Sequence, residues 1–109
     1  MGARETFRVI LRFEIKDGVE PEFEKTWLDI ADVITGHPAN LGQWLLRSTQ
    51  DGTPVYFVIS DWTSEPEFRE FERSADHLEH RVKLHPFRTG GSMETTTVVH
   101  ALQAAGASR

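Results

Sequence analysis

Histidine and arginine side chains are the groups in this sequence best suited to acid–base chemistry and to holding negative charge. A neutral imidazole can accept a proton near pH 7. His77 and His80 lie three residues apart, so on a helix they share a face, and at least one of them is expected to be solvated. Asp76 and Glu79 would point elsewhere, so no metal site is expected. His80 and His85 are candidates for lining a pocket. The histidines are His37, His77, His80, His85 and His100.

The arginines supply permanent positive charge, and three of them are candidates for holding a negatively charged group. They are Arg47, Arg81 and Arg88. Arg47 has apolar neighbours in an expected strand. If it faces inward it needs an anion or a buried partner. The alternative is an exposed strand arginine. Arg47 or Arg81 could stabilise a developing oxyanion.

Aromatic and amide side chains could shape a pocket for a flat ligand. Trp62 is expected to end a strand, where it could pack on aromatic rings together with Phe57, or could instead close the core. The segment HPANLGQWLLRS, residues 37–48, contains Asn40 and Gln43. Asn40 could serve only the turn, helped by Gly42. Gln43, if it faces inward, could hydrogen-bond a phenol or a carbonyl group.

Composition restricts the class of protein. The chain has 109 residues, a formal net charge of −5 and no cysteine. Disulfides, zinc–thiolate sites and iron–sulfur clusters are therefore excluded, and the acidic balance argues against a nucleic-acid partner. No membrane span and no signal peptide are expected, so the predicted location is cytoplasmic. One domain, residues 1–109, is predicted, with a core of about residues 6–100 and a flexible tail over 102–109.

Hydrophobic periodicity predicts the order β-α-β-β-α-β. Period-two alternation predicts strands and a spacing of three to four residues predicts helices. The predicted elements are a strand at 7–15, a helix from Glu20 to Gly36, a hairpin of strands at 44–48 and from Val55 to Trp62, a helix capped by Ser64 and ending at Pro86, and a strand from Met93 to Ala101. In the second helix Phe68 and Phe71 are expected to face inward, and Leu78 and Val82 to continue that stripe. The TGGS segment at 89–92 is predicted to be a flexible joint.

This order is that of the ferredoxin-like split βαβ fold, an α+β architecture with helices on one face of an antiparallel sheet. The other face is left bare. Arg8, Ile10 and Arg12 alternate there, which gives a mixed surface suited to pairing with a second copy of the chain. A homodimer is therefore expected.

Two segments carry a resemblance to a known family. SDWTSEPEFREFERSADH (60–77) and HRVKLHPFRTGGSM (80–93) resemble the antibiotic biosynthesis monooxygenase family. The segment HPANLGQWLLRS (37–48) resembles the small members of that family from aromatic polyketide clusters. The resemblance implies a dimeric α/β barrel with one pocket per subunit. It also implies oxidation of a polycyclic phenol by dioxygen without flavin, haem or metal. Trp62 and Arg81 match family positions.

The sequence departs from one branch of that family at three polar positions. That branch has a histidine where this chain has Arg47, an asparagine in place of Val58 and a tyrosine in place of Phe68. The polar groups that handle the substrate must then come from other residues. The candidates are Asn40, Gln43, Arg47, His80 and His85.

The functional hypothesis is a cofactor-independent monooxygenase that converts an anthrone-type polyketide into a quinone. His80, Arg47, Arg81 and Trp62 are the predicted catalytic residues. The predicted substrate-binding residues are Asn40, Gln43, Phe57, Val58, Phe68 and His85. Three alternatives use the same fold: a polyketide cyclase, a non-catalytic binding dimer and a haem-degrading monooxygenase.

Overall fold

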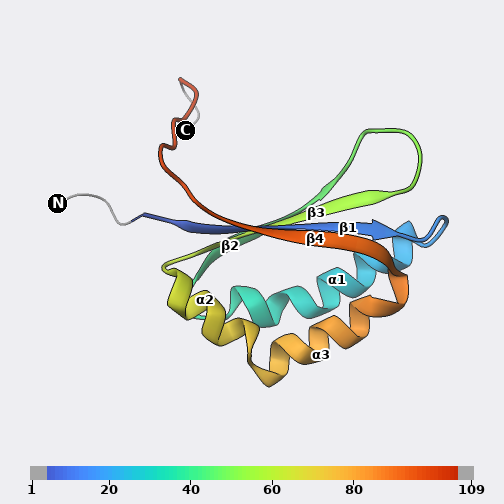
Figure 1. The fold of residues 1–109 in the computed structure, drawn as a ribbon, viewed down its shortest axis with the longest axis horizontal. Helices are drawn as coiled ribbons and strands as arrows, with labels where there is room; N and C mark the ends of the chain where they lie inside the picture. Colours follow the sequence, from blue (N-terminus) through green and yellow to red (C-terminus); the bar gives the residue numbers. More distant parts are fainter. Residues whose placement is uncertain (1–4, 106–109) are drawn as a thin grey trace.

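The computed structural model describes residues 5–105 and shows a four-stranded antiparallel sheet with its helices on one side (Figure 1). The strands lie in the order β2-β3-β1-β4. The elements are β1 (Phe7–Ile15), α1 (Glu20–Thr35), β2 (Asn40–Arg47), β3 (Val55–Trp62), α2 (Glu65–Glu72), α3 (Ala75–Leu84), the short 3-10 helix η1 (His85–Phe87) and β4 (Arg88–Thr97). The predicted ferredoxin-like fold is confirmed. The expectations for residues 1–4 and 106–109 fall outside the described residues.

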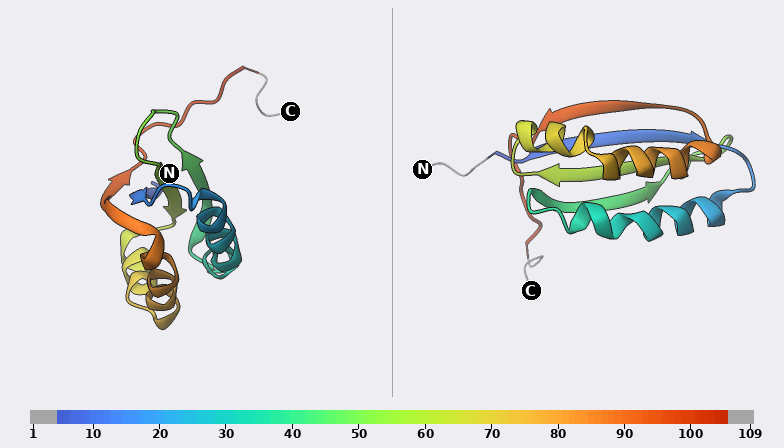
Figure 2. Two further views of the ribbon diagram at one scale, coloured as in Figure 1. Left: turned by 90° about the vertical axis from the view of Figure 1, so that its right-hand side faces the viewer. Right: turned by 90° about the horizontal axis from the view of Figure 1, so that it is seen from below.

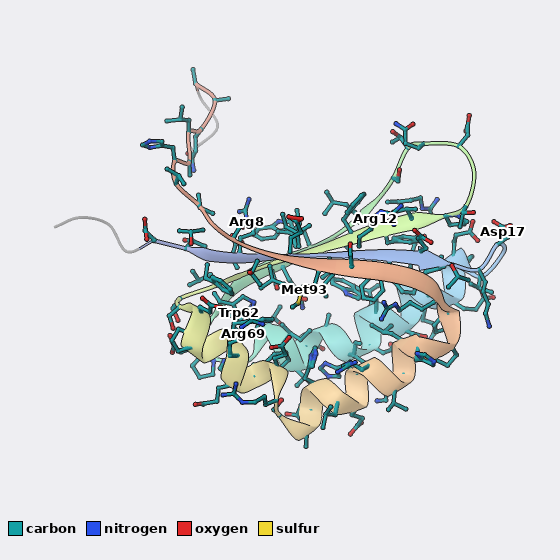
Figure 3. All side chains as sticks on the ribbon, viewed as in Figure 1. Arg8, Arg12, Asp17, Trp62, Arg69 and Met93 are labelled. Atoms are coloured by element: carbon teal, nitrogen blue, oxygen red, sulfur yellow. The ribbon has the colours of Figure 1, made fainter. Side chains whose placement is uncertain are left out.

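Strand β1 occupies the centre of the sheet because it pairs with both β3 and β4. Phe7, Val9 and Phe13 are buried under the helices. The alternating side chains Arg8 and Arg12 lie on the opposite face, as period two requires (Figure 3). The first predicted strand is confirmed with its faces.

Helix α1 begins and ends where the sequence signals predicted. Pro21 lies in the first turn, where its missing N–H costs nothing. Gly36 follows the last turn, and its N–H donates to the carbonyl of Asp32 at 2.9 Å. The stripe that includes Phe23 and Trp27 is buried against the sheet.

The second predicted helix is divided into α2 and α3, which corrects the single helix expected from Ser64 to Pro86. Ser64 caps α2 as predicted, but Ser74 caps a new helix. The Ser74 hydroxyl donates to the carbonyl of Phe71 at 2.6 Å and accepts from the N–H of His77 at 3.2 Å. A serine that caps the next helix lets the chain change direction between the two.

This break changes which side of α3 faces the sheet. His80 and Leu84 are the buried residues of α3. Leu78 is 53% exposed and Val82 is 72% exposed. Leu78 and Val82 still line the cavity between sheet and helices, so the predicted stripe borders that cavity but is not packed in the core.

Strand β4 corrects two further expectations. It runs from Arg88 to Thr97 instead of from Met93 to Ala101. The TGGS segment lies inside the strand and is not a joint, since Gly91 pairs with Phe13 and Ser92 with Arg12. Pairing with β1 supplies the hydrogen bonds that hold this glycine-rich stretch extended.

The helices form two columns across one face of the sheet, α1 in one and α2 followed by α3 in the other (Figure 2). Two clusters of buried side chains fill the layer between sheet and helices, and Leu11 of β1 packs against both of them. The second cluster contains Trp62, Phe68 and Phe71. The candidate site lies in this layer.

Candidate active site

A cavity of about 810 Å³ lies between the helix-covered face of the sheet and the helices. Ligand pockets for small molecules generally have volumes of about 300–1,000 Å³. Every element of the fold contributes to its wall. The lining residues used below are Trp62, Phe68, Phe71, Val58, Gln43, Glu72, His77, His80, Arg81, His85, Arg88 and Met93.

Aromatic side chains form one end of the cavity. The Trp62 ring lies 5.4 Å from the ring of Phe68 and 5.2 Å from that of Phe71, measured between centroids. The Trp62 indole N–H donates to the hydroxyl of Ser60 at 3.0 Å. Trp62 is 1% exposed, so it closes this end of the cavity as part of the core and has no free donor. In Figure 3 Trp62 and Met93 both project into the space between sheet and helices.

His80 projects from α3 into the cavity wall and is 6% exposed. Its Nδ1 atom is buried and has no hydrogen-bond partner within residues 5–105, whereas Nε2 is not buried in this way. Burial lowers the pKa of His80 below its usual 6.5, and the positive charge of Lys83 lowers it further, against the opposing effect of Asp76 and Glu79. The imidazole is consequently neutral at pH 7 and able to accept a proton.

His77 lines the same cavity one turn earlier on α3. Burial lowers its pKa below 6.5, and the positive charge of Arg81 lowers it further, as does His80 when it is protonated, while Glu72 raises it. The ring also packs edge-on against Phe71, with centroids 5.3 Å apart. The structure thus brings two neutral imidazoles to one wall.

Arg81 and His85 line the cavity from the exposed end of α3 and from η1. Arg81 has no carboxylate within salt-bridge distance among residues 5–105, and its charge is therefore available to a ligand. Arg81 is exposed, as is His85, the C-cap of α3. Both predicted residues border the cavity where it meets solvent.

Gln43 is fixed in the wall by its own amide. Its Nε2 donates to the carbonyl of Ala31 at 3.0 Å, which links β2 to α1. Its Oε1 is buried without a hydrogen-bond partner among the described residues. The bond from Nε2 fixes the amide in place, and Oε1 is an acceptor that has no partner among those residues. Val58 and Phe68, each 5% exposed, supply apolar wall at the two positions where one family branch is polar.

Three residues predicted for the site lie outside the cavity lining. The Asn40 amide donates to the carbonyl of Asp61 at 3.1 Å and stabilises the irregular start of β2. Phe57 is on the opposite face of the sheet, where it pairs with Arg12 and Leu46. Strand alternation places it there, because Val58 faces the helices.

Arg47, the third of these residues, is held at the sheet edge instead. It bonds the Glu24 carboxylate, and its Nε donates to the Tyr56 hydroxyl at 3.1 Å. The Tyr56 hydroxyl also donates to Glu24. Burial, followed by the bond to Glu24, raises the pKa of Tyr56 to about 12. Arg47 therefore has the anionic partner that an inward-facing arginine was expected to need.

Several lining residues were not predicted. Arg88 and Met93 lie in β4, which begins at Arg88, five residues before the predicted start at Met93. Arg88 and Met93 pair with Ile15 and Leu11 of the same face of β1, because the β1–β4 register shifts between Glu14 and Ile15, and strict alternation from Arg88 would not have given this placement. Glu72 is bonded to Arg69 at 3.1 Å, a pair at i and i+3 that the helix spacing does signal.

The described residues also bear on metal and membrane sites. Within residues 5–105 no group of three or more histidine, aspartate or glutamate side chains is placed to hold a metal ion. No helix in that range combines the length and apolar character needed to cross a bilayer.

Comparison with known proteins decides the family. Residues 6–83 match the family described as antibiotic biosynthesis monooxygenase. The chain belongs to that family. A relative is the protein SchA of Streptomyces halstedii, which is 30% identical over 83 residues. That match covers 76% of this chain and 22% of SchA, so the chain spans about a fifth of the length of SchA.

Solved structures of similar fold include a described oxygenase. A mutant form of SnoaB of Streptomyces nogalater, described as a cofactor-independent oxygenase, matches with a TM-score of 0.80 and 24% identity, over 94% of this chain and 100% of that one. NE2512 of Nitrosomonas europaea, a protein of unknown function, matches with a TM-score of 0.75 and 13% identity, over 96% and 100%. At 24% and 13% identity, these two matches establish that the chain shares its fold with both proteins.

Proposed function

We propose that this protein is a cofactor-independent monooxygenase that oxidises a polycyclic aromatic polyketide, of the anthrone type, to a quinone with dioxygen. The observation that carries the proposal is one cavity of about 810 Å³ that combines an aromatic end with two neutral imidazoles. Membership of the antibiotic biosynthesis monooxygenase family supports the reaction class.

The aromatic end would bind the flat ring system. Trp62, Phe68 and Phe71 pack on one another and form an apolar wall at this end of the cavity, and Val58 extends it along β3. Contact with aromatic rings removes apolar area of the ligand from water. The rings would be held without a hydrogen bond from Trp62, since Ser60 occupies its N–H.

His80 would act as the general base through Nε2. An anthrone has acidic C–H bonds, because loss of one proton leaves an aromatic phenolate. The lowered pKa keeps His80 unprotonated at pH 7, which is the form that accepts a proton. General bases of this kind accelerate reactions by about 10²–10⁴-fold. His77 is the second imidazole within the same wall.

Arg81 would stabilise the negative charge of the phenolate. Among residues 5–105 it lines the cavity with no carboxylate to neutralise it. One well-placed donor to an oxyanion contributes roughly 3–4 kcal/mol to the transition state. Arg47 was a second candidate, but it is bonded to Glu24 and Tyr56, and we assign it a structural role.

Dioxygen completes the reaction. The substrate anion passes one electron to O₂, and the resulting carbon radical and superoxide combine to form a C–O bond. The peroxide takes up a proton to give a hydroperoxide. Loss of water then leaves the new carbonyl. One CH₂ group and one O₂ thus yield one C=O and one H₂O, with the electrons supplied by the substrate.

We also propose that two copies pair through the bare face of the sheet to form a dimeric α/β barrel. Trp44 and Leu46 are 48% and 40% exposed there, beside Phe57 and Ile59 of β3. Figure 1 shows this face free of helices. Burying such a patch against its own copy removes apolar area from water on both partners.

Oxygen consumption tests the proposal. Metal-stripped protein is mixed with anthrone, and uptake above the spontaneous rate, with formation of the quinone, is expected. His80→Leu should lower the rate by about 10²–10⁴-fold, while His100→Leu, at an exposed position outside the cavity lining, serves as the matched control. Uptake equal to the spontaneous rate would remove the oxygenase proposal.

The same materials separate the alternative functions. A cyclase would convert a polyketide without consuming oxygen, and a haem-degrading enzyme would give a Soret band on titration with haem. A non-catalytic dimer would bind aromatic compounds and leave them unchanged. The cytoplasmic location stays a prediction.

A further inference from the structure

The charge around the cavity differs in sign from the charge of the chain. The chain carries a formal net charge of −5, yet the lining contains three arginines and one carboxylate. The Arg12 side chain points to the opposite face of the sheet and is bonded to Glu14, and the carboxylate, that of Glu72, is bonded to Arg69. The two remaining cations are Arg81 and Arg88. Neither has a carboxylate within salt-bridge distance among residues 5–105.

Arg88 is directed to the cavity side of the sheet. Its Cζ atom lies 5.6 Å from the ring centroid of Phe13, a buried residue of the helix-covered face. Its Nε donates to the carbonyl of Gly90 at 3.4 Å. The side chain therefore lies along the inner surface of β4 and still leaves guanidinium N–H groups unbonded.

Gly91 makes this position of Arg88 possible. It pairs with Phe13 across the β1–β4 ladder. A Cβ atom at residue 91 would lie 2.3 Å from the carbonyl oxygen of Arg12 and 3.0 Å from Nη2 of Arg88. The backbone carbonyl cannot move aside, so the position requires glycine. The absence of a side chain at residue 91 leaves room for the Arg88 guanidinium.

Arg81 and Arg88 belong to one end of the cavity, where α3 continues through η1 into β4. Trp62 belongs to the other end, since it pairs with Phe7 while Arg88 pairs with Ile15. The cavity is thus aromatic at one end and cationic at the other. A ligand that fills it is elongated along β1.

We infer that the ligand carries a carboxylate, which Arg88 binds at the cationic end, with Arg81 adding to the positive potential. This inference rests on the proposed function and narrows its substrate to an aromatic polyketide acid. A guanidinium matches a carboxylate with two parallel N–H groups. A charged hydrogen bond of this kind corresponds to roughly tenfold or more in affinity.

Binding of two matched probes tests the inference. Anthracene-2-carboxylate and the neutral 2-(hydroxymethyl)anthracene are titrated against the full chain, followed by quenching of tryptophan fluorescence. The carboxylate is expected to bind roughly tenfold or more tightly at low salt, with the preference falling as salt rises. Arg88→Gln should abolish the preference and leave the affinity for the neutral probe unchanged, which also shows that the variant is folded. Arg88→Lys should keep part of it.

Arg73→Gln is the matched control, because Arg73 is exposed at the end of α2 and is not part of the cavity lining. It should keep the full preference. Equal affinity for the two probes, or a preference that survives Arg88→Gln, overturns the inference even if anthrone is oxidised. A carboxylate preference lost in Arg88→Gln without any oxygen uptake would support the inference and refute the oxygenase reaction instead.

Discussion

His80→Leu should make the folded protein more stable while it removes the proposed base. The Nδ1 atom of His80 is buried without a partner among residues 5–105. A buried polar atom in that state costs about 1–3 kcal/mol. Leucine removes the atom, has a similar size and favours a helix slightly more than histidine does. The free energy of unfolding should therefore rise by about 1–3 kcal/mol. Each kcal/mol corresponds to roughly 4–8 °C in Tm for a domain of this size.

The rise in the free energy of unfolding caused by His80→Leu should be larger at acidic pH. The folded protein binds a proton at His80 only at a pH below its usual pKa of 6.5, whereas the unfolded chain binds it near 6.5. The native protein thus has its full stability above pH 6.5 and loses part of it as the pH falls. The leucine variant lacks this site, although His77 keeps a similar one. The difference between variant and parent should grow as the pH is lowered from 7.5 to 5.

Urea unfolding followed by circular dichroism, at pH 7.5 and pH 5 and at one protein concentration, measures both effects. His100→Leu controls for loss of an exposed histidine. A variant less stable than the parent, or a gain that does not depend on pH, would refute the argument that His80 is an unsatisfied, neutral imidazole.

Three further predictions follow from the same contacts. Tyr56 is the only tyrosine of the chain, so the absorbance of its phenolate should report a pKa near 12 in the folded protein. In the unfolded chain the Tyr56 pKa should be near the usual 10, so the free energy of unfolding should fall as the pH rises from 10 to 12. Glu24→Gln should lower the titration midpoint of Tyr56 in the folded protein. A midpoint unchanged in that variant would contradict the bond to Glu24. Trp62→Ala should cost about 3–5 kcal/mol in urea unfolding, because it empties the contacts with Phe68 and Phe71; a cost under 1 kcal/mol would show that the indole is not part of the core. Leu46→Glu should convert the proposed dimer to a monomer in analytical ultracentrifugation. Leu28→Glu, on an exposed part of α1, is the control and should leave the dimer intact. A parent chain that sediments as a monomer would refute the proposed dimer.

The two faces of β1 and the starts of α1 and α2 were predictable from local sequence. Alternation in β1 separated the buried Phe7 and Phe13 from Arg8 and Arg12. Pro21 and Ser64 marked the starts of α1 and α2. These features depend on a repeat of two or 3.6 residues and on capping bonds over three or four residues, which a single sequence contains.

Position within the cavity was decided by tertiary contacts. Arg47 and Arg88 are both strand arginines, yet Arg47 meets Glu24, which is 23 residues away, and Arg88 lies over Phe13, which is remote in the sequence. His80 is buried because Ser74 starts a new helix and turns that side of α3 to the sheet. A repeat along the chain fixes the face of an element that a side chain occupies. Only the packing of distant elements determines whether that face meets a partner, a cavity or solvent.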